Sequence, residues 1–248
     1  GPSRLSVDGE IGPRLALDWA LDSPDLATLL PSAAGSLTGS GKLLGTPEAA
    51  HLVATLTGSQ LRYGEDRIEA LSLDASVDLS GRTESHLELS HGDGTLADVA
   101  IHSVELQGSG YPGEHQLAMT AETGQGRLKL QPKGDWQAPD WRYRMTDATL
   151  ALPDPASTWY LAGPAEGRIS ADTATLPETC WRSGEAMACL RAGMRPGLLT
   201  LLGRDAEGRA LAVLRVTLEG AAGHVLHRNF TAFVVGEGES SRDEARAG

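Results

Sequence analysis

Two cysteines, Cys180 and Cys189, are the residues of this chain whose type and spacing point most directly to chemistry. A two-residue turn at Gly184-Glu185 suits a type II′ hairpin, in which glycine takes the first central position. Counted outward from that turn, the cysteines face each other on a non-hydrogen-bonded rung, where Cα atoms lie about 4.5 Å apart, within the range that a disulfide accepts. The spacing predicts a cross-strand disulfide and therefore an oxidising compartment, the periplasm or the exterior. The alternative is two unrelated buried thiols.

Motifs for catalysis or metal binding are weak in this sequence. Residues 108–113 fit G-x-G-x-x-G, but Pro112 lies inside the motif and strand-like alternation follows, which indicates a hairpin turn and not a nucleotide-binding loop. No G-x-S-x-G motif is present, and the seven histidines lack a spacing that would bring their rings to one point, as a metal requires. We therefore predict no catalytic residue, no metal and no cofactor, and a protein that is not an enzyme.

Tryptophans form another group with possible chemistry: Trp136, Trp141, Trp159 and Trp181. Such rings line sugar-binding platforms, although tryptophans on strands more often cover a core or an edge. A sugar platform requires several of these rings to gather at one spot beside polar groups. A carbohydrate-binding or accessory β-sandwich domain is therefore the alternative to the function inferred below.

The composition limits the classes of partner. The chain has 248 residues, of which 40% are apolar and 4% aromatic, and its formal net charge is −12. This acidity argues against a nucleic-acid partner, because phosphates require lysine and arginine, but it does not exclude contact with uncharged lipid tails. No apolar run approaches the roughly 18 residues of a membrane span, and if the protein is exported, its targeting sequence is expected upstream of this fragment.

The dominant pattern is alternation with period two, which predicts strands with one apolar and one wet face. It is clearest in residues 71–79, where Leu, Ala and Val alternate with Ser and Asp. Clusters of Gly, Asp, Ser and Pro separate such runs about every 8–12 residues, as antiparallel sheets require. The pattern predicts an all-β fold built as an elongated sheet to which hairpins are added at an edge.

One segment interrupts the alternation. Ser23 as N-cap, Pro24 at the first helical position, Asp25 in the first turn and Pro31 as terminator predict one short helix near residues 24–30.

We expect four segments along the chain. Residues 1–11 comprise a protease-cleavage scar (Gly1-Pro2-Ser3) and a lead-in strand, and residues 12–192 form the main β domain. Residues 193–235 add three strands, at 198–202, 210–218 and 224–235, with turns at 205–208 and 220–223. The charged residues 236–248 form a disordered tail.

Residues ~12–192 resemble the TamB family, the translocation and assembly module proteins of Gram-negative bacteria, which belong to the AsmA-like group. The resemblance is carried by residues 37–47 (LTGSGKLLGTP), 71–81 (LSLDASVDLSG), 115–119 (HQLAM) and 126–130 (GRLKL), by Trp136, Trp141 and Trp159, and by the cysteine hairpin. It implies a β-taco, which is a long curved sheet with a greasy concave face. It further implies a periplasmic protein with an inner-membrane anchor and an outer-membrane partner of the Omp85 type, similar to TamA. The implied activity is phospholipid transport between the two membranes, with support of outer-membrane protein assembly.

A lipid groove requires an apolar face without unpaired charges. The strands predict such a face from these residues: Leu71, Leu73, Val77, Leu79, Leu87, Leu89, Val104, Leu106, Leu117, Met119, Leu128, Leu130, Leu150 and Leu152. Alternating leucines alone are equally typical of a closed sandwich core, and the resemblance is what favours the groove.

Residues ~198–235 depart from this pattern. They are similar to a terminal β-sandwich segment of family 2 glycoside hydrolases, without any catalytic motif of those enzymes. A periplasmic scaffold that binds protein edges by strand addition is a third hypothesis.

Overall fold

The computed structural model describes residues 2–47, 49–96, 99–137, 140–153, 158–195, 198–205, 210–219 and 227–234. Nearly all of them lie in strands, and the chain divides into two compact units, residues 1–160 and 161–248. The strands that begin in the first unit are β1 (Arg4–Glu10), β2 (Leu15–Ser23), β3 (Ala33–Thr46), β4 (Ala49–Tyr63), β5 (Asp66–Asp78), β6 (Ser85–His91), β7 (Gly94–Leu96), β8 (Val99–Tyr111), β9 (Glu114–Thr123), β10 (Gly126–Gln137), β11 (Asp140–Ala151) and β12 (Thr158–Leu161).

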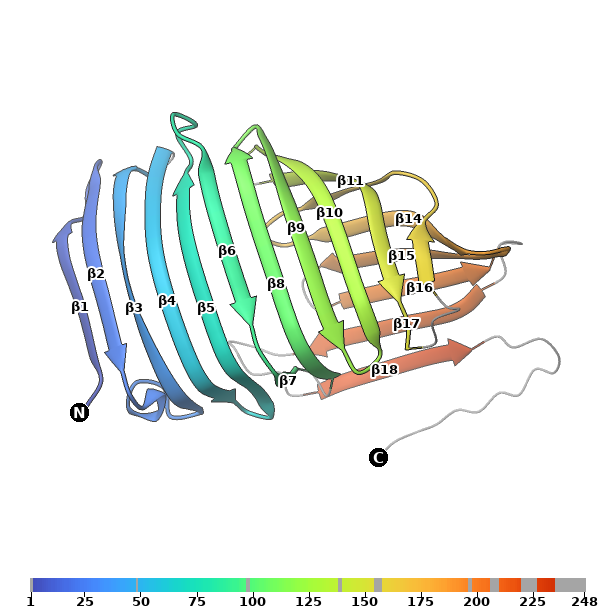
Figure 1. The fold of residues 1–248 in the computed structure, drawn as a ribbon, viewed down its shortest axis with the longest axis horizontal. Helices are drawn as coiled ribbons and strands as arrows, with labels where there is room; N and C mark the ends of the chain where they lie inside the picture. Colours follow the sequence, from blue (N-terminus) through green and yellow to red (C-terminus); the bar gives the residue numbers. More distant parts are fainter. Residues whose placement is uncertain are drawn as a thin grey trace. The chain divides into compact units, whose positions relative to one another are not determined.

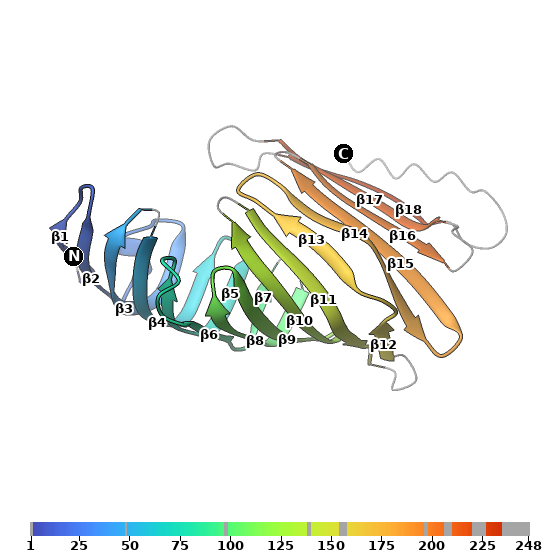
Figure 2. The same ribbon diagram turned by 90° about the horizontal axis from the view of Figure 1, so that it is seen from above.

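The first unit is a single antiparallel sheet whose strands follow chain order. β1 to β5 pair successively, β5 pairs with β6 and the short β7, both of these pair with β8, and β8 to β12 again pair successively. Figure 1 shows β1 to β10 side by side, and Figure 2 shows the same succession from above. The predicted all-β, elongated sheet is confirmed.

The two faces of this sheet differ in polarity. Leu73 opposes Leu56 on one side and Leu89 on the other, whereas the next residue, Asp74, opposes Thr55 and Glu88. Directly opposed residues of antiparallel strands point to the same face, and successive residues point to opposite faces. The period-two pattern therefore separates an apolar from a polar face across the whole unit.

The buried apolar side chains of the first unit are mostly small. Among its described residues they are Ala50, Ala54, Ala75, Met145 and Ala148. The leucines on the apolar face are half-buried, unlike those of a closed core, because side chains within one layer cover one another only partly.

The predicted short helix is a single 3-10 turn, η1 (Leu26–Thr28), and its expected N-cap is wrong. Asp25 is the N-cap, and its carboxylate accepts a hydrogen bond of 3.0 Å from the backbone N–H of Ala27. Ser23 instead ends β2, where it is fully buried and its hydroxyl lies 2.8 Å from that of Ser3. The Ser23 hydroxyl therefore bonds Ser3, twenty residues earlier in the chain, and does not cap the helical turn.

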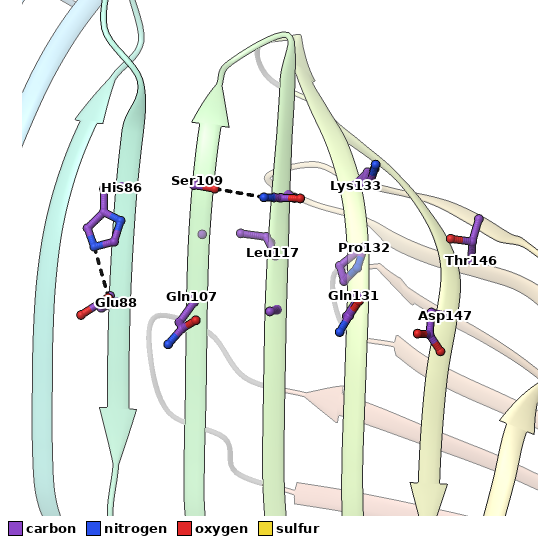
Figure 3. Close-up of a pocket in the computed structure, with 13 residues that line it drawn as sticks. His86, Glu88, Gln107, Ser109, Leu117, Gln131, Pro132, Lys133, Thr146 and Asp147 are labelled. Atoms are coloured by element: carbon purple, nitrogen blue, oxygen red, sulfur yellow. Dashed lines mark hydrogen bonds and ion pairs between the residues drawn. The ribbon is translucent and has the colours of Figure 1, made fainter.

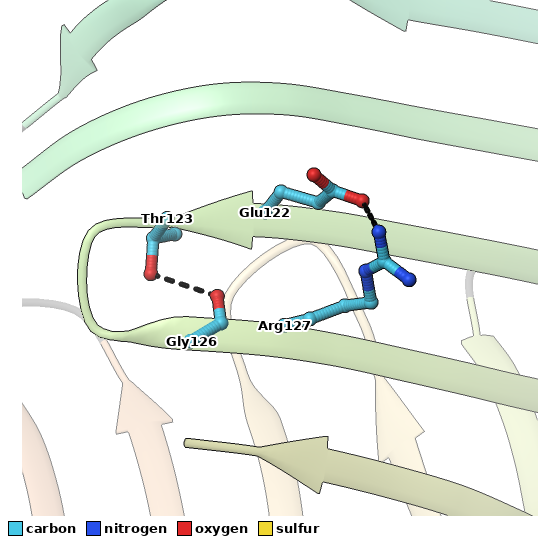
Figure 4. Close-up of polar contacts among 4 residues, drawn as sticks. All are labelled: Glu122, Thr123, Gly126 and Arg127. Atoms are coloured by element: carbon cyan, nitrogen blue, oxygen red, sulfur yellow. Dashed lines mark hydrogen bonds and ion pairs between the residues drawn. The ribbon is translucent and has the colours of Figure 1, made fainter. Parts of the chain in front are cut away.

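The hairpin between β9 and β10 shows how local chemistry fixes the register. Thr123 opposes Gly126, and the Thr123 hydroxyl donates to the Gly126 carbonyl over 3.1 Å (Figure 4). Gly126 has a φ of +144°, and a Cβ there would lie 2.3 Å from the carbonyl oxygen of Ala151 on β11. Beside the turn, Arg127 pairs with Glu122 on the polar face. Only glycine fits this close approach of two strands.

The turn after β5 is organised by a buried carboxylate, Asp78. It accepts hydrogen bonds from the backbone N–H groups of Ser80, Arg82 and Thr83 and from the hydroxyls of Ser80 and Thr83, at 2.5–3.2 Å. The bond from the Ser80 hydroxyl is the largest of the effects that hold the pKa of Asp78 well below its ordinary value. Ionised Asp78 therefore stabilises this turn.

The second unit carries β13 (Ala165–Ile169), β14 (Ala174–Ser183), β15 (Ala186–Arg195), β16 (Leu198–Asp205), β17 (Ala210–Glu219) and β18 (His227–Val234). From β13 to β18 each strand pairs antiparallel with the next. Beyond residue 193, β16, β17 and β18 correspond to the strands predicted at 198–202, 210–218 and 224–235. Residues 224–226 and 235, most of the two predicted turns and the proposed tail, residues 236–248, lie outside the described residues. The predicted domain boundary at 192/193 stays a prediction.

The cysteine hairpin has the predicted register. Gly184 has a φ of +58° in a two-residue turn, Arg182 opposes Met187, and Cys180 opposes Cys189. The two sulfurs form a disulfide between Cα atoms 3.9 Å apart. The disulfide therefore closes a short loop within the second unit.

Acid is expected to weaken the turn at Asp78. Because the folded pKa is lowered, the stabilisation is complete above the unfolded pKa of about 3.9 and is lost as the pH falls below it. Asp78→Asn should lower the melting temperature at pH 7 by a few degrees and reduce its decline between about pH 5 and pH 2. Circular dichroism melts would measure both, with Asp74→Asn, an exposed carboxylate of the same strand, as the control. Equal acid sensitivity of wild type and Asp78→Asn would contradict this assignment.

Reduction is expected to destabilise the second unit. Opening a loop closed by residues nine apart removes roughly 2–3 kcal/mol of unfolding free energy. Urea unfolding with and without reductant would measure the difference. The unfolding free energy of Cys180→Ser should equal that of the reduced wild type and should not change when reductant is added. Coincident wild-type curves in both conditions would show that the disulfide adds no stability.

Candidate functional site

The apolar face of the first sheet is organised in rows of side chains that oppose one another strand by strand. The central row runs from β2 to β11 and contains Leu21, Gly39, Leu56, Leu73, Leu89, Leu106, Met119, Leu130 and Ala148. The lower row lies next to the central row, toward the Asp66 end of β5, and the upper row lies toward the Asp78 end. The lower row contains Leu37, Gly58, Leu71, His91, Val104, Ala121, Leu128, Leu150 and Trp159. The upper row contains Trp19, Gly41, Ala54, Ala75, Leu87, Gly108 and Leu117. Together these rows make one continuous surface.

Nearly every residue predicted for a lipid groove lies on this face. Val77 sits beyond the upper row, opposite Leu52, and the other predicted strand residues belong to the three rows. The exceptions are Leu79 and Leu152, which follow the ends of β5 and β11 and are 39% and 37% exposed. The structure thus brings the predicted residues together, while their role in binding lipid stays a prediction.

Sequence reasoning missed the glycines of this face. A Cβ at Gly41 would lie 2.6 Å from Trp19 Nε1, and one at Gly108 would lie 2.8 Å from Leu117 Cδ2. Large side chains on one strand therefore lean over glycines on the next. The signal was present in the alternation, because these glycines occupy the apolar positions of their strands.

A β-bulge extends the face at the lower ends of β3 and β4. Gly35 and Gln60 have φ angles of +98° and +51°, and the pairing of the two strands shifts here. Beyond the bulge, Leu61 returns to the apolar side, since a Cβ at Gly58 would meet its Cδ1 at 2.7 Å. A hollow of about 640 Å³ next to the bulge is lined by Leu61, Ile68 and Ile101 together with charged residues.

Charge is absent from the three rows. They contain no Asp, Glu, Lys or Arg, and their one ionisable residue is His91. The His91 ring is 7% exposed, and neither of its nitrogens has a hydrogen-bond partner among the described residues. The three rows therefore carry no permanently charged side chain.

Aromatic side chains gather at the upper margin of the apolar face, near the ends of β10 and β11. Trp141 opposes Trp136, and its indole N–H donates to His115 Nε2 over 2.6 Å. The Trp141 ring also stacks on Tyr143 with centroids 5.1 Å apart. Burial raises the pKa of Tyr143. Of the four tryptophans considered for a sugar platform, Trp136 and Trp141 therefore lie together.

The opposite face carries a separate, polar hollow of about 360 Å³ between β6 and β11 (Figure 3). His86 lies 3.5 Å from Glu88, and Gln116 donates to Ser109 over 3.4 Å. Among the described residues, no group of three or more His, Cys, Asp and Glu converges as a metal site would. The hollow is a solvated surface of mixed charge.

Comparison with known protein families identifies the chain. A family model described as TamB, N-terminal domain, matches residues 1–198, which extends the predicted resemblance at both ends. No solved structure matches this chain. No helix in the described part of the chain is long and apolar enough to span a membrane. The matched family is a transport and assembly module of the cell envelope and not a family of enzymes. Since the match covers most of its length, the chain belongs to the TamB family.

Proposed function

We propose that the apolar face shields phospholipid acyl chains during transport between the inner and outer membranes, without enzymatic chemistry. The observation that carries the proposal is the continuous set of rows without Asp, Glu, Lys or Arg. An acyl chain on this surface meets aliphatic side chains at every strand and no unpaired ion.

The dimensions of the face suit an acyl chain. The central row crosses nine strands, so at about 4.8 Å per strand it extends about 38 Å. The hydrocarbon core of a bilayer is roughly 30 Å thick and contains two layers of acyl chains. One acyl chain therefore fits along the row with space to spare.

Half-burial of the row supports an open face over a closed core. Leu73, Leu89 and Leu106 lie at the middle of the sheet, and each keeps part of its surface accessible. In a closed sandwich the residues at this position would be the most deeply buried of the domain. Accessible apolar area of this extent is a binding surface.

The cellular setting of the proposal follows the family. We place the chain in the periplasm, as part of a parent protein with an inner-membrane anchor outside this fragment. Its partners are phospholipid and an Omp85-type outer-membrane protein similar to TamA, and its transport supports outer-membrane protein assembly. The family match over residues 1–198 supports this setting.

A second candidate function, sugar binding, is favoured by the neighbouring Trp136 and Trp141 rings. Against it, Trp159 lies in the lower row, Trp181 lies in the second unit, and the Trp141 indole N–H already bonds His115. Fewer rings and fewer free polar groups remain than a sugar platform requires.

Leu106→Arg tests the proposal. The new guanidinium can extend into solvent from an open face, so the fold should persist with a small change in melting temperature. A charge among acyl chains costs about 2.5–3.5 kcal/mol, so bound lipid should fall roughly 100-fold. Native mass spectrometry after detergent-free purification would measure the lipid, and circular dichroism the fold. Val77→Arg should act in the same way.

Gln107→Arg is the matched control, because Gln107 is the next residue of β8 and is exposed on the polar face. It should keep wild-type lipid. Wholesale unfolding of Leu106→Arg beside a folded Gln107→Arg would show that the face is a sealed core, and the transport proposal would fail.

A further inference from the structure

The cluster of His115, Trp136, Trp141 and Tyr143, here called the aromatic corner, is not explained by shielding of acyl chains alone. We propose that it binds the ammonium head group of a zwitterionic phospholipid, of the ethanolamine or choline type, whose acyl chains lie on the adjoining rows. This inference rests on the proposed function and names the lipid class for it.

The aromatic corner presents one available ring on a fixed support. Trp141 is held by its 2.6 Å hydrogen bond to His115, by the ring of Tyr143 at 5.1 Å and by that of His115 at 6.1 Å. Beneath these rings lies Gly134, where a Cβ would meet Trp141 Nε1 at 2.3 Å. Trp136, on the rung opposite Trp141, remains 40% exposed. Neighbouring indoles of this kind attract an ammonium group through their π faces.

The aromatic corner stands at the margin of the apolar face. Trp136 is one residue from the end of β10, and Trp141 is one residue from the start of β11. Moving down the same strands from this margin, the face continues through Tyr143 and Gly134 to Met145 and then to Leu130. A lipid laid along this path has its acyl chains on aliphatic residues and its head group where the sheet meets water, the position that amphipathic rings favour.

Charge selects the type of head group. The rows next to the aromatic corner supply no Lys or Arg to a phosphate or to an anionic head group. The charged neighbours of the two tryptophans, Asp135, Asp140 and Arg142, alternate with them along β10 and β11 and therefore point to the polar face. An ammonium group on the apolar side is attracted by the rings, whereas a glycerol head group is not.

The test is a competition for uptake by the 248-residue protein. Each vesicle contains equal amounts of phosphatidylcholine and phosphatidylglycerol with identical acyl chains. Both lipids are therefore presented to the protein from the same vesicle surface. After incubation the protein is separated from the vesicles, and native mass spectrometry distinguishes the two bound lipids by mass. One cation–π contact corresponds to about fivefold preference, so we expect phosphatidylcholine to exceed phosphatidylglycerol by about that ratio.

Trp136→Leu should bring this ratio close to one, and Trp136→Phe should keep an intermediate ratio because phenylalanine retains a weaker π face. Trp181→Leu, in the second unit, is the control and should keep the wild-type ratio. Equal uptake of the two lipids by the wild type, or an unchanged ratio in Trp136→Leu, would overturn the inference while leaving the transport proposal in place. Uptake of neither lipid would refute both proposals. An oligosaccharide that quenches tryptophan fluorescence only when Trp136 is present would overturn the head-group inference.

Discussion

The register between antiparallel strands is the constraint on which the rest of this structure depends. A slip of one residue in β5 would move Leu73 to the polar face and place Asp74 between leucines of the neighbouring strands. The apolar rows exist because every strand from β2 to β11 avoids such a slip. Glycine turns and bulges are the local devices that prevent it, as at Gly126 and at the Gly35–Gln60 bulge.

Side chains on the apolar face pack against one another within a single layer, and this packing partly replaces the contacts that a second layer would supply. Trp19 covers Gly41, and Leu117 covers Gly108, so that each large side chain fills the space that a small residue leaves on the next strand. The ladder of backbone hydrogen bonds gives the sheet its order, and this side-chain cover removes only part of the apolar area from water. The remaining exposed area is what makes the face available to a ligand.

Sequence reasoning succeeded where the cause is local. Alternation placed the leucines on one side of their strands, and counting from Gly184-Glu185 paired Cys180 with Cys189, because both depend on neighbours in the chain. It failed at Ser23, whose burial depends on Ser3, and it did not foresee the bond between His115 and Trp141, which are 26 residues apart. Contacts between distant strands require the register of every strand between them, and alternation alone does not specify it.

The proposed transport requires an apolar face that favours passage over tight binding. Seven of the nine residues of the central row are Leu or Met, so most rungs offer a similar aliphatic contact; the other two are Gly39 and Ala148. An acyl chain that moves by one strand loses and regains about the same apolar area, so its free energy changes little along the row. A surface that conducts a ligand needs such uniform and moderate affinity, since a single deep site would hold the ligand in place. The half-buried, uncharged rows satisfy this requirement, and a densely packed core does not.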